Sequence, residues 1–215
     1  MQKSMYSLML NDGVVREIDN LARMRNTNRS NLINQILAEY VSYVTPEKQI
    51  SDIFDYIDGL LSDAVFSSPV WQGESIMCVK TSLDYKYRPT VKYSVEFNKY
   101  PKDTLGYLKV VFRTQSQALL DRLEYFFDAW TRMESFHLAR YGLSPAYSID
   151  AGKFTRSLLN TQKQLSSERT AQAITAFITM LDGIIKDYLG EKFEAFSQIE
   201  DRYIGYLKDP DTVII

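Results

Sequence analysis

The first 44 residues of the chain contain a short alternating segment that runs directly into two short amphipathic segments. In residues 5–10, Tyr6, Leu8 and Leu10 fall on one face of an extended backbone, and the residues between them fall on the other. This period of two predicts a half-buried strand. No second strand is expected within hairpin distance, so the backbone N–H and C=O groups of this strand need a partner. We expect that partner to be the same segment of a second copy, which would form a two-stranded antiparallel ribbon in a dimer.

Two short helices are predicted after this strand. Asn11 and Asp12 can cap the first helix, which we expect to end near Asn26 after cations in its last turn. Asn28 or Ser30 can cap the second. Its apolar positions recur at helical spacing, at Leu32, Ile33, Ile36, Leu37, Tyr40, Val41 and Val44. A segment of this length buries little surface by itself, so two copies that share one core form the unit we expect.

This order of strand, helix, short turn and helix resembles the ribbon-helix-helix family of bacterial DNA-binding proteins, the MetJ, Arc and CopG group. The resemblance covers residues 4–44, about a fifth of the chain. The residues that carry it are the strand 6–11, the positions Val14, Ile18 and Leu21, the turn 28–33 (Asn-Arg-Ser-Asn-Leu-Ile) and the apolar run 36–41.

The resemblance implies three sets of functional residues. Outward strand residues that face base edges in the major groove would be Lys3, Met5, Ser7 and Met9. Backbone amides that open the second helix and hold a phosphate would belong to Asn28, Arg29 and Ser30, as expected for a helix N-terminus. The core of the dimer would be formed by Tyr6, Leu8, Leu10, Ile18, Leu32, Ile36, Leu37 and Tyr40.

Two of the base-facing positions are methionines, in contrast to the polar residues usual in the family. A thioether cannot donate a hydrogen bond to a base, although it can pack against a thymine methyl group. Direct readout would therefore be sparse, or would shift to Ser7, Lys3 and Ser4. The alternative interpretation is that the segment only dimerises.

The charge of the chain weighs against strong non-specific binding to nucleic acid. The whole chain has a net charge of −2, whereas nucleic-acid-binding proteins are usually basic. Residues 1–45 carry five Lys and Arg against four Asp and Glu, and the remainder is acidic. Affinity for DNA in general should be low and salt-sensitive, and tight binding would need several dimers together.

The rest of the chain predicts a connecting helix over 46–66 and a C-terminal α+β domain over 67–215. A segment rich in β-forming residues at 75–87 and two alternating segments at 90–97 and 105–113 predict a three-stranded antiparallel meander. Helical periodicity follows, and we expect helices over 116–142, 152–164, 171–189 and 191–208. The predicted fold class is therefore mainly α with a small sheet, a ribbon-helix-helix domain followed by a meander packed by helices.

The sequence offers little for catalysis or for metal binding. It contains one histidine, His137, and one cysteine, Cys78, and neither a Gly-rich phosphate loop nor a nucleophile elbow. We expect no metal, no cofactor and no enzyme activity. The single cysteine suggests a reducing compartment, and the chain has neither a signal-peptide pattern nor an apolar run of the ~20 residues that a membrane span needs. These features predict a cytoplasmic protein.

Two classes of function fit these features. The first is a sequence-specific transcriptional regulator, most simply a repressor, whose C-terminal domain builds oligomers or senses a small-molecule or protein effector. A pocket for such an effector could be lined by Tyr85, Tyr87, Tyr93, Tyr100 and Tyr107, although ordinary packing explains these residues better. The second is a DNA accessory protein of a mobile element, for plasmid partition or a relaxosome, or an antitoxin whose C-terminal domain binds a protein.

Overall fold

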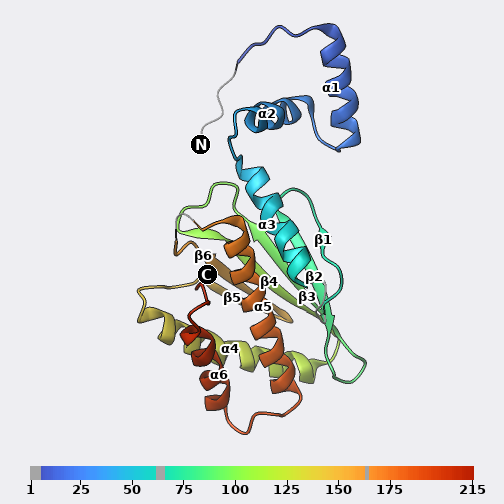
Figure 1. Cartoon of the computed structure of the whole chain (residues 1–215). Helices are drawn as coiled ribbons and strands as arrows, with labels where there is room; N and C mark the ends of the chain where they lie inside the picture. The colour runs from blue at the N-terminus through green and yellow to red at the C-terminus, as the bar shows by residue number, and fades with distance from the viewer. Residues whose placement is uncertain (1–5, 62–65, 163–164) are drawn as a thin grey trace. The chain divides into compact units, whose positions relative to one another are not determined.

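The computed structural model describes residues 6–61, 66–162 and 165–215, which pack into two units (Figure 1). The first unit comprises residues 1–49, and the second comprises residues 50–215. The division therefore falls after Gln49, inside the helix that the sequence predicted as a connector over 46–66. That helix is α3 (Pro46–Leu61), and residues 62–65 of the prediction lie outside the described residues.

The first unit contains the two helices predicted from the sequence, α1 (Asp12–Met24) and α2 (Arg29–Tyr40). Side-chain caps begin both helices: Asn11 Oδ1 accepts a hydrogen bond from Gly13 N at 2.8 Å, and Asn28 Oδ1 accepts one from Asn31 N at 2.9 Å. Asn26 has a left-handed backbone with φ of 50°, which ends α1 and starts the short turn to α2. The predicted caps and the predicted turn are confirmed.

The segment predicted as a strand has no regular secondary structure in the single chain. Residues 6–11 are irregular and exposed to solvent. Tyr6 and Leu8 expose 84% and 62% of their surface. A ribbon between two copies cannot form within one chain, so this prediction concerns an assembly that a single chain does not contain.

The second unit is built on one antiparallel sheet of six strands in the order β1-β2-β3-β4-β6-β5. Three strands are those predicted from the sequence: β2 (Ile76–Ser82), β3 (Thr90–Phe97) and β4 (Thr104–Arg113). The others are β1 (Val70–Trp71), β5 (Tyr147–Asp150) and β6 (Lys153–Leu159). The predicted fold class, with a three-stranded meander as its small sheet, was therefore wrong.

The largest error was the helix predicted over 152–164, because its first half is strand β6. Phe154, Arg156 and Leu158 of β6 alternate and are buried on the side that faces the helices. A buried arginine interrupts the apolar alternation by which a strand is recognised, so the sequence pattern concealed this one. Gly152 supplies the turn between β5 and β6 with φ of 69°.

Three helices pack against one face of the sheet: α3, α4 (Gln117–Ala139) and α5 (Ser167–Leu189). A further helix, α6 (Phe196–Lys208), packs on α4 and α5. Ring contacts join these layers, as between Phe54 and Phe97 at 5.5 Å and between Phe127 and Phe154 at 4.2 Å. The core of this unit lies between the helices and that face. The opposite face of the sheet carries polar and charged side chains together with Ile76, Cys78, Tyr107 and Val111, and this agrees with the prediction of a sheet that has one wet side.

Candidate nucleic-acid interface

The start of α2 is the best-formed candidate for an anion site in the first unit. The Asn28 cap occupies the N–H of Asn31, and the N–H groups of Arg29 and Ser30 make no hydrogen bond among the described residues. All three predicted phosphate-binding residues, Asn28, Arg29 and Ser30, are exposed. Free N–H donors and the positive end of the helix dipole favour an anion at this position. The structure thus gathers Asn28, Arg29 and Ser30 in one helical turn.

The guanidinium of Arg29 is already bound by a carboxylate from α1. Its Nε lies 2.7 Å from Asp19 Oδ1, and its Nη2 lies 2.5 Å from Asp19 Oδ2. The hydrogen bond from Arg29 lowers the pKa of Asp19 despite an opposing effect of burial, and the same bond raises the pKa of Arg29. Since its charge is balanced, Arg29 can serve an anion better through its backbone N–H than through its side chain. Sequence reasoning missed this pair, because its partners lie on different helices.

Most of the residues predicted to form a dimer core are exposed in the single chain. Leu32 is buried and Ile18 is half-buried within the unit. The other six are exposed: Tyr6, Leu8, Leu10, Ile36, Leu37 and Tyr40. On α2 the exposed apolar side continues past its last residue with Val41 and Val44, which expose 67% and 61% of their surface. A contiguous apolar surface on so small a unit is typical of an interface.

The predicted base-facing residues are only partly described. Ser7 and Met9 lie in the irregular segment, and both are exposed. No hydrogen bond joins residues 6–10 to α1 or α2 among the described residues. Lys3 and Met5 lie outside the described residues.

The second unit contains a buried polar cluster that the sequence did not reveal. The carboxylate of Glu134 on α4 is wholly buried and accepts hydrogen bonds from four side chains: Trp130, Tyr147, Arg156 and Tyr203. Burial and the negative charge of Glu134 raise the pKa of Tyr147 and of Tyr203 well above the usual tyrosine range. Because its oxygens accept these four hydrogen bonds, the Glu134 carboxylate joins α4 to β5, β6 and α6.

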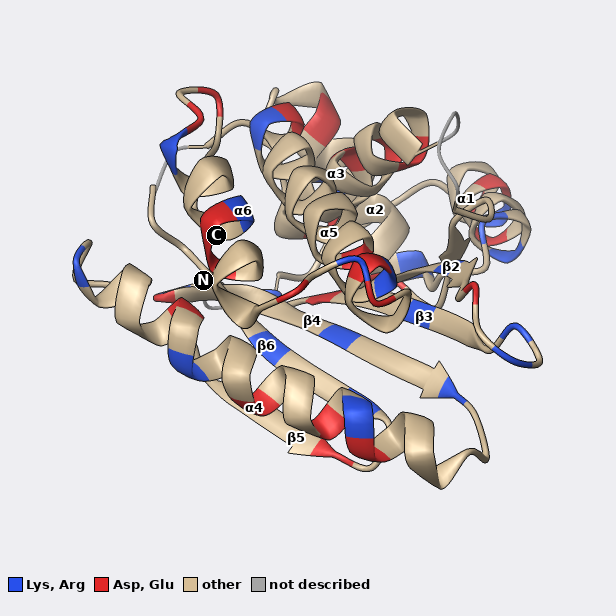
Figure 2. Cartoon of the chain, turned by 90° about the horizontal axis from the view of Figure 1, so that it is seen from below, with Lys and Arg blue, Asp and Glu red and all other residues tan. Residues whose placement is uncertain are grey.

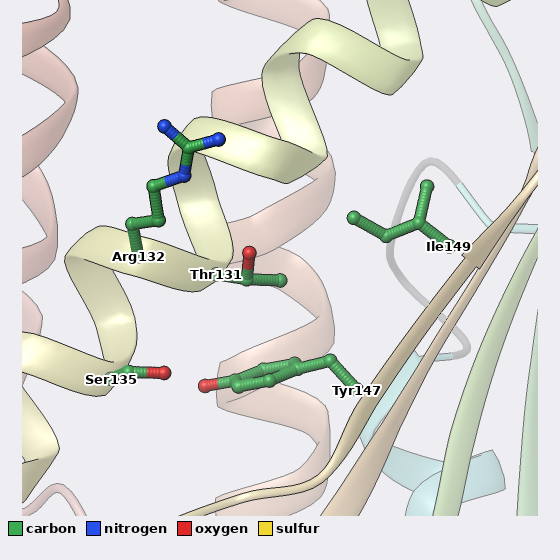
Figure 3. A pocket seen from close by; sticks show the side chains of 5 residues that line it. All are labelled: Thr131, Arg132, Ser135, Tyr147 and Ile149. Carbon is green, nitrogen blue, oxygen red and sulfur yellow. The ribbon is translucent and has the colours of Figure 1, made fainter.

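A shallow hollow borders this cluster on the surface of α4 and β5 (Figure 3). Its lining is formed by Thr131, Arg132, Ser135, Tyr147 and Ile149. The hydroxyl of Tyr147 points toward α4 and donates to Glu134 Oε2 at 2.9 Å, so it is not available to a ligand. The five tyrosines considered for an effector pocket do not gather there or elsewhere: Tyr93 is wholly buried, whereas Tyr87 exposes 87% of its surface.

The single histidine and the single cysteine of the chain, both in the second unit, each have a partner within the fold. His137 Nε2 lies 2.7 Å from Glu200 Oε1, which connects α4 to α6. Cys78 is buried, and its Sγ lies 3.3 Å from Ser94 Oγ. No group of three or more His, Cys, Asp or Glu suited to a metal ion occurs among residues 6–61, 66–162 and 165–215. In the same residues, no helix combines the length and apolarity that a membrane crossing requires.

The chain matches no protein-family model, no curated protein sequence and no solved structure.

Proposed function

We propose that the chain is a dimeric, sequence-specific DNA-binding regulator, acting in the cytoplasm as a repressor. The observation that carries this proposal is the exposed apolar surface of the first unit, which covers α2 and the segment before α1. Burial of one such side chain contributes about 1.5–3 kcal/mol. A second copy that buries Ile36, Leu37 and Tyr40 against their counterparts would satisfy this surface.

Pairing of residues 6–10 from the two copies would complete the unit. The exposed backbone of this segment could form the ladder of an antiparallel ribbon, with Leu8 and Leu10 turned toward the shared core. Ser7 and Met9 would then lie on the outer face of the ribbon, which has dimensions that fit the major groove. In each copy, the N–H groups of Arg29 and Ser30 would bind a backbone phosphate and set the ribbon in its groove.

Sequence specificity would come from contacts to base edges, because phosphate contacts carry no sequence information. The chain is acidic overall, so the attraction to DNA in general is small and stable occupancy requires a chosen site. Contacts of Ser7 to base edges and of Met9 to thymine methyl groups would supply that choice.

The test is a selection of bound fragments from a library of genomic DNA by the purified full-length protein. The mass of the free protein and of its complex would be measured by sedimentation. We expect a dimer in solution and an enriched sequence with two-fold symmetry, bound by one or more dimers. A protein that stays monomeric at tens of micromolar and enriches no sequence would contradict the proposal.

A further inference from the structure

The face of the sheet that the helices leave open is basic, in contrast to the acidic chain as a whole. Strand alternation places five cations on it: Lys80, Lys92, Lys109, Arg113 and Lys153. Glu96 and Asp150 are the carboxylates on the described strands of this side. Figure 2 shows basic residues along β3, β4 and β6. We call these five cations the basic sheet face.

Three lysines of the basic sheet face lie in one row across the strands. Lys80 is directly opposite Lys92, Lys92 is opposite Val111, and Val111 is opposite Lys153. Neighbouring strands lie about 4.8 Å apart, so the row places three positive charges within roughly 15 Å. Like charges directly opposite on a sheet destabilise it. A bound anion would remove that cost.

Most of these charges have no acidic partner in the fold. Lys109 pairs with Glu96, and Lys92 Nζ lies 3.5 Å from the amide oxygen of Gln72. Lys80, Arg113 and Lys153 form no ion pair among the described residues. The side chain of Asp150 accepts a hydrogen bond from the N–H of Ala151, next in the chain. With Glu96 paired to Lys109 and Asp150 directly opposite Lys153, the five cations and two carboxylates leave this face with a net charge of +3.

The turn between β2 and β3 extends the positive surface. Lys86, Tyr87 and Arg88 at its tip are exposed, and Lys86 Nζ lies 5.1 Å from the centre of the Tyr87 ring. At the strand ends beside this tip, Thr90 is opposite Arg113. The turn and the row carry Lys80, Lys86, Arg88, Lys92 and Lys153 against Asp84 and Asp150, a net charge of +3, beside the exposed ring of Tyr87.

We infer that the basic sheet face binds the phosphate backbone of double-stranded DNA, as a second contact separate from the first unit. Repeated phosphates along a duplex match a row of cations on an open sheet, and they need no recognition of bases. Cys78, Ser94 and Ser157 on this face are themselves buried, so an anion would contact the lysine and arginine side chains and not the backbone. Contact of this kind would add affinity to any sequence that the first unit selects.

The experiment compares two triple variants of the full chain with equal changes in net charge. One replaces the row by Lys80→Gln, Lys92→Gln and Lys153→Gln. The matched control replaces three exposed cations on the helical side by Arg132→Gln, Arg140→Gln and Lys208→Gln. Binding to a random duplex is measured by fluorescence anisotropy over a range of salt concentrations. Thermal unfolding of both variants verifies that each is folded.

Affinity for DNA falls as salt rises, so the slope of log affinity against log salt is negative. Loss of three phosphate contacts should make this slope less negative by about 2.7. We expect this change in the row variant and a change of less than about 1 in the control. Equal slopes in the two variants, or a row variant that binds as the parent does, would overturn the inference. If the partner of this face is an acidic protein and not DNA, the row variant would bind DNA as the parent does.

The variant Arg29→Pro separates this inference from the proposed function. If the first unit does not bind DNA, this variant leaves binding unchanged while the row variant still loses it. If the sheet face does not bind DNA, Arg29→Pro weakens DNA binding and the row variant leaves it unchanged.

Discussion

Arg156 of β6 and Glu134 of α4 form an ion pair at the centre of the second unit, with Arg156 Nε 3.0 Å from Glu134 Oε1. Both side chains are almost completely buried. The guanidinium lies over the ring of Phe177 at 4.4 Å and donates to the carbonyl of Ser157. Although burial opposes the charge, the attraction of Glu134 raises the pKa of Arg156. Through Tyr147 and Tyr203, the same carboxylate connects α4 to β5 and α6.

Removal of one charge from this pair should destabilise the fold strongly. Glu134→Gln leaves the Arg156 guanidinium buried without a counter-charge, and a loss of about 3–5 kcal/mol in the free energy of unfolding is expected. Urea denaturation measures it. The control is Glu124→Gln, an exposed position on the same helix, where we expect a change within about 0.5 kcal/mol. A loss below about 1 kcal/mol for Glu134→Gln would show that the pair matters little.

A surface cluster between α5 and α6 should make stability depend on pH. Asp187 accepts hydrogen bonds from Lys192 Nζ at 2.9 Å and from Arg202 Nη1 at 2.6 Å. The bond from Lys192 lowers the pKa of Asp187 below 3.8, against a smaller effect of burial, and Arg202 adds to the decrease. The carboxylate therefore stabilises the fold at pH values above its unfolded pKa, and this contribution is lost as the pH falls through the lower folded pKa.

Asp187→Asn should accordingly be less stable than the parent at pH 7, by up to about 1 kcal/mol for such an exposed cluster. The difference should shrink as the pH falls below about 4. Urea denaturation between pH 7 and pH 3 measures it. A difference that is the same at both ends of that range would exclude the carboxylate as its cause.

The backbone of Arg29 can be tested separately from its side chain. Arg29→Ala and Arg29→Pro both remove the guanidinium, and only the proline also removes the N–H. Proline suits the first position of a helix, and Asn28 before it is extended with ψ of 161°, so α2 should be retained. A hydrogen bond to a charged group contributes about 1.5–3 kcal/mol, so Arg29→Pro should bind DNA roughly 10- to 100-fold more weakly than Arg29→Ala. Equal affinities would argue against a phosphate at this N-terminus.

The apolar side of α2 can be tested with matched aspartates. Leu37 exposes 51% of its surface in the single chain, and Leu60 on α3, outside the predicted dimer core, exposes 45%. Leu37→Asp should dissociate the dimer, because it would bury an unpaired charge, whereas Leu60→Asp should leave the dimer intact. Neither should unfold the chain. Sedimentation at several concentrations measures the result, and dimers of equal stability in both variants would place the interface elsewhere.

Local patterns predicted the parts of the fold whose causes are local. The caps at Asn11 and Asn28, the β-forming residues of β2 and the alternation in β3 and β4 are patterns of residues close in sequence, and the structure confirms them. Strand β6 was missed because Arg156 occupies a core position, which becomes acceptable only through Glu134, 22 residues earlier on a helix. Strand β5 has four residues, too few for a pattern. In the candidate site, the turn 28–30 was predictable, but the hydrogen bonds that Arg29 donates to Asp19 join two helices and were not predictable.

The central claim is that residues 6–10 of two copies pair as strands, and amide hydrogen exchange followed by NMR tests it most directly. In the single chain this backbone is irregular and exposed, so every N–H in it should exchange rapidly. In an antiparallel ribbon, N–H groups at alternate positions are bonded to the partner strand. We predict protection at every second residue of this segment once the protein concentration favours the dimer. Rapid exchange at all of these positions, at a concentration where sedimentation shows a dimer, would contradict the account.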